Sequence, residues 1–277
     1  RCYNYAEFCH QLLVRNVSTA MERQLKFPPL IEALLEVRWV LSGDRLPLDP
    51  AYPLIVGLFY GEVKDSFPVK DELMPQSQFP PEVLQHTVTH RFRVGEDQWP
   101  LVQIGPGIAS LNYDATYNWN RFKTEANAFF TRLRASHNTA ANADPALEQL
   151  TLRFINVVRI EDDDGDMLEF LRNKLHMEFT PMPPNSSLPD SACDLAGFRF
   201  QTAYSLSSPA GGAMMTVGTG WRGDPQAVVF DLNVVSAEHH VPELDEFSVG
   251  LGEAQAVIED WFFALIDGEL HARFEKE

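Results

Sequence analysis

The segment "FPPLIEALLEVRW", Phe27 to Trp39, places Glu32, Glu36 and Arg38 inside an otherwise apolar run. Its odd-numbered positions from 31 onward are all apolar, and all three charges fall on even-numbered positions, as expected for a strand with one buried face. The two glutamates are four residues apart, which also fits a helix. The β-branched and aromatic end of the segment favours the strand. We therefore predict a strand whose second face is polar.

The elements predicted after this strand occur twice in the same order. Residues 21–145 predict β-α-β-β-β-α, and residues 146–277 predict the same succession, while residues 1–20 are set apart as an N-terminal extension. Each half alone would leave one face of its strands uncovered, so we expect the halves to join edge to edge. The predicted fold is α+β: an internal duplication that forms one antiparallel sheet with helices packed on one face.

Several local features of this fold are predicted in detail. Asp49 is expected to cap the first helix, with Pro50 at the first helical position. Residues 68–84 are rich in proline and are expected to form a loop, and residues 138–145 are expected to link the two halves. Residues 249–274 carry a helical apolar period throughout, which predicts one long final helix.

The chain carries a net charge of −17, and this charge is unevenly distributed. Residues 1–146 hold 14 Lys and Arg against 16 Asp and Glu, a net of −2, whereas residues 147–277 hold 8 against 23, a net of −15. An acidic surface repels phosphate backbones, so we predict that the chain does not bind nucleic acid. No run approaches about 18 consecutive apolar residues, so no membrane span is predicted.

The three cysteines are Cys2, Cys9 and Cys193, an odd number that does not suit a disulfide framework. A metal site built on Cys2, Cys9 and His10 would lack both a zinc spacing and a fourth ligand. Residues 1–20 lack the long apolar core and cleavage site of a signal peptide. We therefore expect a cytoplasmic protein with no metal and no cofactor.

The sequence contains none of the common catalytic motifs: no G-x-S-x-G, no P-loop and no H-E-x-x-H. Residues 161–166, "EDDDGD", suggest a calcium loop, but Gly165 is misplaced and the glutamate of the twelfth position is missing. A turn whose carboxylates favour a helix N-terminus is the preferred interpretation. A second group of potential ligands comprises Glu238, His239, His240 and Glu243. Adjacent strand residues point to opposite faces, so this group is interpreted as a solvated loop.

Positive charge is concentrated on one predicted strand and one predicted helix of the first half. The residues are Arg91, Arg93, Arg121, Lys123, Arg132 and Arg134. A solvated face is the simplest interpretation of such a group. The functional alternative is a surface for an anionic partner, a protein in preference to a nucleic acid.

The charges of the opening strand have counterparts in the equivalent strand of the second half. There Arg153 and Arg159 lie on one face, and Asn156 lies on the other. We predict that the two strands are neighbours or near neighbours, which brings Glu36 and Arg153 within cross-strand reach, and that the charges form a polar seam between the halves. The alternative is a ligand site on the concave face of the sheet, with Glu36, Arg38 and Arg153 as its polar groups.

Several stretches of the sequence resemble one known family. They are "PPLIEALLEVRW" (28–39), "LVQIG" (101–105), "LNYDATYNWNRF" (111–122) and "LRFINVVRI" (152–160). Together they resemble a sporadically distributed family of uncharacterised bacterial proteins, which opens with Pro-Pro-Ile-x-Glu-Ala-x-x-Glu-Ile-Arg-Phe and carries a central Leu-Arg-Tyr-Ile-Asn. The resemblance spans residues 27–274. It departs from that pattern at Leu30, which is inserted before Ile31, and at Trp39 and Phe154, which replace Phe and Tyr.

The duplicated order of elements is also similar to the saddle of TATA-binding-protein-like folds and to helix-grip folds, although a fold does not determine a function. The resemblance implies a bacterial accessory system, linked to defence or to mobile elements, but no activity. We expect a non-catalytic intracellular interaction or adaptor module that binds a protein partner and can form oligomers. The alternative is a small-molecule-binding protein or a hydrolase with its site on the concave sheet face.

Overall fold

The computed structural model describes residues 23–41, 49–75, 79–178, 197–221, 224–237 and 244–276. The expected extension, residues 1–20, lies outside these ranges. So do the three cysteines and the cluster of Glu238, His239, His240 and Glu243. All helices, strands and contacts of this structure that are named lie within these ranges.

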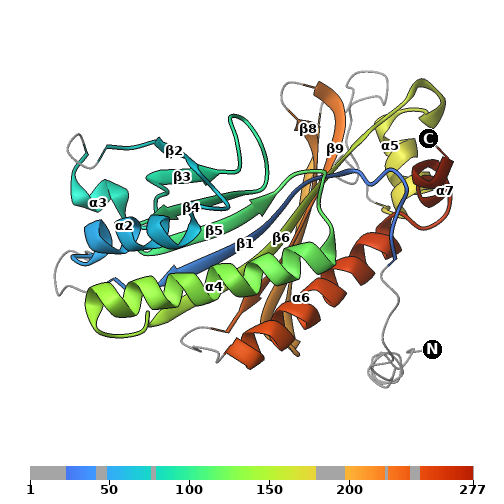
Figure 1. Ribbon diagram of the computed structural model, residues 1–277. Coiled ribbons are helices and arrows are strands. Elements are labelled where there is room, and N and C mark those ends of the chain that lie inside the picture. Colours follow the sequence, from blue (N-terminus) through green and yellow to red (C-terminus); the bar gives the residue numbers. More distant parts are fainter. Residues whose placement is uncertain are drawn as a thin grey trace.

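A nine-stranded antiparallel sheet and six α-helices make up the fold, as the predicted α+β class requires (Figure 1). The first elements are β1 (Leu30–Trp39), α2 (Tyr52–Val63), β2 (Val69–Glu72), α3 (Pro81–Leu84), β3 (His90–Arg93), β4 (Leu101–Gly105), β5 (Ile108–Tyr113) and α4 (Trp119–Ala141). The remaining elements are β6 (Leu147–Arg159), the 3₁₀ turn η2 (Asp162–Asp164), α5 (Met167–Leu175), β7 (Arg199–Ser207), β8 (Ala210–Trp221), β9 (Asp224–Ser236), α6 (Leu244–Leu265) and α7 (Glu269–Lys276).

The strand order in the sheet is β2-β3-β4-β5-β1-β6-β9-β8-β7. The opening strand β1 therefore lies at the centre, between β5 and β6, and it is antiparallel to both. The prediction that the two charged strands are neighbours is confirmed. The two edges of the sheet are β2, in the first half of the chain, and β7, in the second.

The long helices α2, α4 and α6 lie along one side of the sheet (Figure 1). The alternation of β1 explains this, because Leu35, Val37 and Trp39 are at most 1% exposed and face the helices. One apolar cluster runs from β1 to α6 and includes the stacked rings of Phe130 and Phe247, whose centroids are 4.2 Å apart. The core is therefore shared by both halves of the chain.

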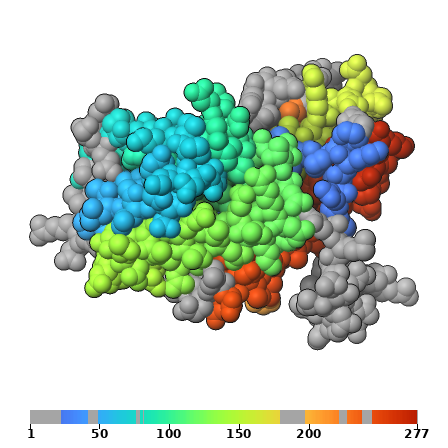
Figure 2. All heavy atoms as spheres, viewed as in Figure 1, coloured from blue at the N-terminus to red at the C-terminus, as the bar shows by residue number. Residues whose placement is uncertain are grey.

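A second apolar cluster joins α5 and α7 to the far end of strands β6, β8 and β9. The segment before β1 lies against α7 (Figure 2). The backbone N–H of Phe27 donates to the carbonyl oxygen of Phe274 at 3.0 Å, and the Arg23 guanidinium lies 4.7 Å from the centre of the Phe263 ring. The start of the described chain is thus fixed to its end.

The beginning of α2 differs from the prediction. The helix begins at Tyr52, its N-cap residue is Ala51, and no side chain caps it. The carboxylate of Asp49 instead accepts a hydrogen bond from Trp39 Nε1 at 2.9 Å. Asp49 therefore satisfies the buried indole of the central strand, a tertiary contact that a local capping rule cannot anticipate.

The other differences are in the loops and at the end of the chain. Strand β2 and helix α3 lie within residues 68–84, where only a loop was predicted, and α4 extends through the first half of the predicted linker. The final helix is two helices, α6 and α7, because the chain turns at Gly268, which adopts a φ of 94°. A positive φ of this size interrupts an α-helix and favours glycine.

Candidate functional site

The charged residues of β1 lie on the face of the sheet opposite the long helices. Glu36 is paired in register with Ser110 of β5 and Thr151 of β6, and Arg38 with Ile108 and Gln149. Their partners in the ladder point to the same face. The charges of the opening segment thus belong to a polar strip at the centre of the sheet.

Each of these charges is held by a partner close to it. Arg38 Nε donates to Glu36 Oε1 at 2.7 Å along the same strand. Asn112 Nδ2 donates to Glu32 Oε1 at 2.9 Å, and Ser110 Oγ donates to Asn112 Oδ1 at 2.7 Å. Ser110 and Asn112 are buried, so this part of the strip is a fixed hydrogen-bond network.

Arg153 forms the strongest pair of the strip, and its partner is Asp231 of β9. Arg153 Nε donates to Asp231 Oδ1 at 2.8 Å, and Nη2 donates to Oδ2 at 2.6 Å, a bidentate arrangement. The hydrogen bonds from the guanidinium to Asp231 raise the pKa of Arg153 above its ordinary value, although burial opposes this. The guanidinium is therefore a permanent charge.

The expected direct pair of Glu36 and Arg153 is not formed. In the register of β1 and β6, Glu36 lies opposite Thr151 and Arg153 lies opposite Leu34. The two charged residues are therefore diagonal neighbours, whose Cβ atoms in a sheet are about 7–8 Å apart or slightly less. The seam is polar, as predicted, but its contacts are Glu36 with Arg38 and Arg153 with Asp231.

The remaining residues of the predicted seam are dispersed. Asn156 is 3% exposed and lies on the helix side of β6, paired in register with Leu30 and Phe230. Arg159 is exposed at the end of β6 and is paired in register with Ala227. Neither residue lies beside Glu36 and Arg153.

The six basic residues do not form one surface. Arg91 and Arg93 lie on the helix-free side of the sheet, where Arg93 Nε is 3.3 Å from Asp71 Oδ2 of the neighbouring strand. The other four are on α4, on the opposite side of the sheet. There Arg121 donates to Glu125 at 3.0 Å and Arg134 pairs with Asp144 at 2.6 Å. Several of these charges are thus neutralised locally.

A double-mutant cycle can measure the Arg153 pair. The Arg153 side chain is 41% exposed and that of Asp231 is 17% exposed, so their coupling should lie between that of an exposed and a buried pair, at about 1–2 kcal/mol. We expect this value for Arg153→Met with Asp231→Asn in urea unfolding, and less than about 0.5 kcal/mol for Glu36→Gln with Arg153→Met. A larger coupling for the second pair would contradict the assigned contacts.

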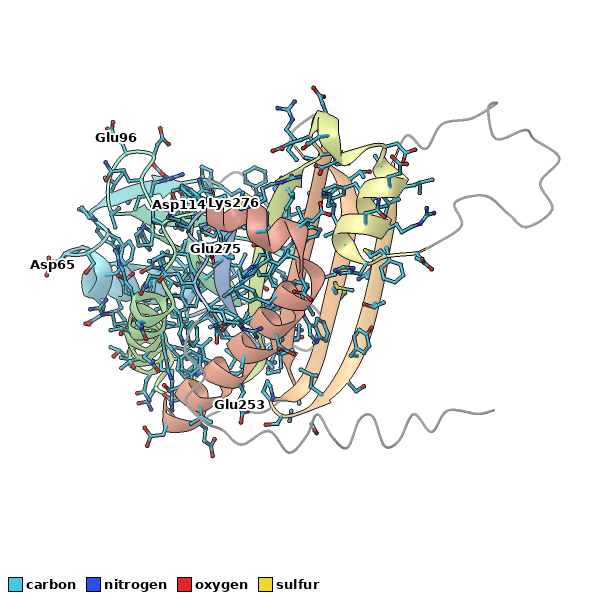
Figure 3. All side chains as sticks on the ribbon, turned by 90° about the vertical axis from the view of Figure 1, so that its right-hand side faces the viewer. Asp65, Glu96, Asp114, Glu253, Glu275 and Lys276 are labelled. Carbon is cyan, nitrogen blue, oxygen red and sulfur yellow. The ribbon has the colours of Figure 1, made fainter. Side chains whose placement is uncertain are left out.

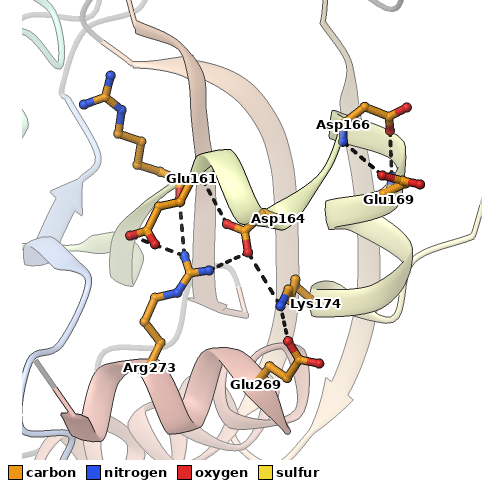
Figure 4. Close-up of polar contacts among 8 residues, drawn as sticks. Glu161, Asp164, Asp166, Glu169, Lys174, Glu269 and Arg273 are labelled. Atoms are coloured by element: carbon orange, nitrogen blue, oxygen red, sulfur yellow. Dashed lines mark hydrogen bonds and ion pairs between the residues drawn. The ribbon is translucent and has the colours of Figure 1, made fainter.

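The acidic turn at residues 161–166 forms a structural ion cluster (Figure 4). Asp164 Oδ1 accepts from Arg273 Nη2 at 2.5 Å and lies 3.6 Å from Lys174 Nζ, and Lys174 also contacts Glu269. Asp166 caps α5 by accepting from the backbone N–H of Glu169 at 2.9 Å. The interpretation of this segment as a turn with capping carboxylates is confirmed, and the cluster ties η2 and α5 to α7.

A hydrogen-bonded group of polar side chains in the interior escaped the sequence analysis, because Tyr52 is far in the chain from Thr89 and His90. Tyr52 Oη lies 2.6 Å from Thr89 Oγ1 and 3.0 Å from His90 Nδ1. Burial raises the pKa of Tyr52 and lowers that of His90, so both side chains favour their neutral forms. Tyr52 and Thr89 are at most 1% exposed. We interpret this group as an anchor of α2 on β3.

Strand β7 is the exposed edge of the second half. Its sequence is "RFQTAYSLS", and seven of its nine residues are exposed. Phe200 and Tyr204 are 42% and 51% exposed, which is high for large apolar side chains. Tyr204 packs edge-on against Trp261 of α6 at 5.1 Å between ring centroids. This edge had no place among the predicted sites.

A pocket of about 710 Å³ lies on the helix side of the sheet, between α6 and strands β6 and β9. Its floor includes Leu35 of β1, the residue next to Glu36. Leu35 and Glu36 point to opposite faces, so the pocket and the polar strip are separated by the sheet. The predicted ligand site with Glu36, Arg38 and Arg153 as its polar groups therefore does not coincide with this pocket.

No family model and no curated protein matches the chain. None of the helices in the described ranges is long and apolar enough to cross a bilayer. Within the same ranges, no three His, Cys, Asp or Glu side chains are placed to hold a metal ion.

Proposed function

We propose that this chain is a non-catalytic interaction module of a bacterial accessory system, and that it binds an extended segment of a protein partner at the edge strand β7. The observation that carries the proposal is the exposure of this nine-residue edge. An edge strand presents backbone N–H and C=O groups that another strand can pair with, and several families of interaction domain bind peptides in this way.

The two edges of the sheet differ in a way that supports this choice. Strand β2 has only four residues, "VKDE", of which three are charged. Short length and charge are common protections against the addition of a further strand. Strand β7 is more than twice as long, contains no proline, and has one charged residue, Arg199, at its first position. The sheet is therefore protected at one edge and open to pairing at the other.

The chemistry of the partner follows from the side chains and the charge around β7. Phe200 and Tyr204 are on the same face of the strand, four residues apart, and they favour apolar side chains at alternating positions of the added segment. The half of the chain that contains β7 carries a net charge of −15. We therefore infer a partner segment that alternates apolar and basic residues, because opposite charge speeds and favours association.

A comparison of the two halves, made on the hypothesis of an internal duplication, also points to β7 as the binding strand. Outward from the central pair β1 and β6, the order is β5-β4-β3-β2 on one side and β9-β8-β7 on the other. If the halves are copies, β7 corresponds to β3, and β3 is covered by β2. The added segment would occupy the position that corresponds to β2.

A peptide-binding experiment tests the proposal. We expect a nonapeptide of alternating valine and lysine to bind the chain in fluorescence anisotropy, and a valine–glutamate peptide to bind at least tenfold more weakly. The backbone N–H groups of an edge strand alternate between the side that pairs with the sheet and the open side. Of the two variants Ala203→Pro and Tyr204→Pro, one therefore removes a donor on the open side. The variant that removes this donor should lose at least tenfold in peptide affinity, whereas Lys70→Pro on the other edge should not.

Each other outcome has a defined meaning. Unchanged binding in both β7 variants would overturn the proposal. Loss of stability in both variants without any loss of peptide binding would mean that the edge is paired from within the chain, which also overturns it. A concentration-dependent dimer in sedimentation that disappears in the same variant would assign the edge to a second copy of the chain instead of a partner.

The competing proposals have less support. A small-molecule or hydrolytic site on the polar strip would have to use Glu36, Arg38 and Arg153. Glu36 and Arg38 are already hydrogen-bonded to each other, and Arg153 is hydrogen-bonded to Asp231. Nucleic-acid binding is disfavoured by the net charge and by the separation of the six basic residues onto two faces. We retain a cytoplasmic location as part of the proposal.

A further inference from the structure

The pocket between α6 and the sheet has the size and lining of a small-molecule site. Its volume of about 710 Å³ falls within the range of about 300–1,000 Å³ that is typical of ligand pockets. Leu35, Leu150, Leu152 and Val234 line it from the sheet, and Phe247 and Leu251 from α6. Apolar walls of this kind stabilise a ligand by removing its apolar surface from water.

A glycine keeps the helix wall of this pocket open. Gly250 lies within α6, and a Cβ atom added there would meet no other atom within 4 Å. Glycine within a helix costs roughly 1 kcal/mol relative to alanine. Gly250 lines the pocket between the buried residues Phe247 and Leu251, so a larger side chain at this position would reduce the empty volume.

The polar part of the lining is acidic. Asp245, Glu246 and Glu253 of α6 line the pocket, and no lysine, arginine or histidine is among its described lining residues. The first two residues lie in the first turn of the helix, where carboxylates also favour the helix dipole. Glu253 lies more than two turns into the helix, beyond that effect, and Figure 3 labels it on α6 beside the strands of the second half.

We propose that this pocket binds an amphipathic cation, with its apolar body against the leucine floor and its ammonium group near Glu253. An apolar chamber with carboxylates on one wall complements a ligand that is apolar at one end and positive at the other. The same carboxylates disfavour fatty acids and other amphipathic anions, because a negative head group would be desolvated beside like charges. None of the described lining residues of this pocket belongs to β7, so the proposal does not depend on the β7 edge.

Two ligands of equal chain length test the charge rule. We expect decyltrimethylammonium to bind with a stoichiometry of one in isothermal titration calorimetry below its micelle concentration. Decanoate should bind at least tenfold more weakly, and Glu253→Gln should reduce this preference at least threefold. Glu62→Gln on α2 is the control, since Glu62 is exposed on a helix that does not line the pocket. Equal binding of both ligands, or no binding of either, would overturn the proposal.

A pair of glycine variants tests the location. Gly250→Leu should place a bulky side chain in the pocket wall, reduce the volume left for the ligand and lower the affinity for decyltrimethylammonium at least tenfold. Gly57→Leu on α2 is the matched control, because an added Cβ at Gly57 also meets nothing within 4 Å. Gly250→Ala, a smaller change that favours the helix, should keep the fold and give an intermediate affinity. Unchanged affinity in a folded Gly250→Leu protein would place the ligand elsewhere and overturn the assignment. The β7 proline variant that loses only an outward N–H donor should bind the ligand normally.

Discussion

Asp164→Ala is expected to lower the free energy of unfolding by about 3–5 kcal/mol, because it removes the one buried anion between two cations. The Asp164 side chain is 1% exposed, and it contacts Arg273 and Lys174. Both cations are largely buried, with 17% and 14% of their side chains exposed. Without the carboxylate they lose their common partner, and the contact of α7 with α5 and η2 is broken at its centre.

Urea unfolding of the variant and of Asp163→Ala measures this effect. Asp163 is the neighbouring residue in the same turn and is exposed, so its replacement should change the free energy of unfolding by no more than about 0.5 kcal/mol. Similar losses in the two variants would show that the turn, and not the buried contact, determines stability.

The same residue predicts a dependence on pH. Burial alone would raise the pKa of Asp164. The hydrogen bonds from Arg273 and from the backbone of Glu161, together with the positive charges of Arg273 and Lys174, outweigh this effect. The pKa of Asp164 therefore lies below its ordinary value of 3.8. A carboxylate with a lowered pKa contributes stability above its unfolded pKa and loses it as the pH falls through the folded value. The difference in the free energy of unfolding between wild type and Asp164→Asn should therefore be constant from pH 7 to about pH 5 and shrink below about pH 4.

The central strand was predictable because one local pattern contains the answer. Alternation in β1 places Leu35 and Val37 in the core and Glu36 and Arg38 on the other face, whatever the neighbouring strands are. By contrast, β2 has no apolar pattern and is a strand only because it pairs with β3. A short, charged segment of this kind gives no signal that a sequence pattern can detect.

The contacts of the candidate site were less predictable than its strands. The sequence indicated that Arg153 would lie on a strand that is a neighbour or near neighbour of the opening one, and the two strands are direct neighbours. Its partner, Asp231, is 78 residues away, and the contact depends on the register between β6 and β9. A shift of one residue in that register would turn Asp231 to the other face of the sheet. The open edge at β7 likewise exists only once the order of all nine strands is known.

Phe130→Ala is expected to destabilise the whole molecule, by about 3–5 kcal/mol, rather than one half of it. Phe130 of α4 is fully buried, and its ring stacks on Phe247 of α6, with 12° between the ring planes. Helix α4 belongs to the first half of the chain and α6 to the second. The cavity left by the substitution therefore opens where the two halves share their core, and neither half can close it alone.

Hydrogen exchange can distinguish a shared core from two separate ones. In the Phe130→Ala protein, the amides of β5 and β9 should lose protection together and by similar factors, because β1 and β6 connect them through one continuous sheet. Leu54→Ala on α2 is the control, since Leu54 is 62% exposed and its loss should leave exchange in both strands nearly unchanged. If β9 lost protection while β5 kept it, the halves would unfold independently. The stacked rings would then be a contact between two domains, and the two halves would not share one apolar cluster.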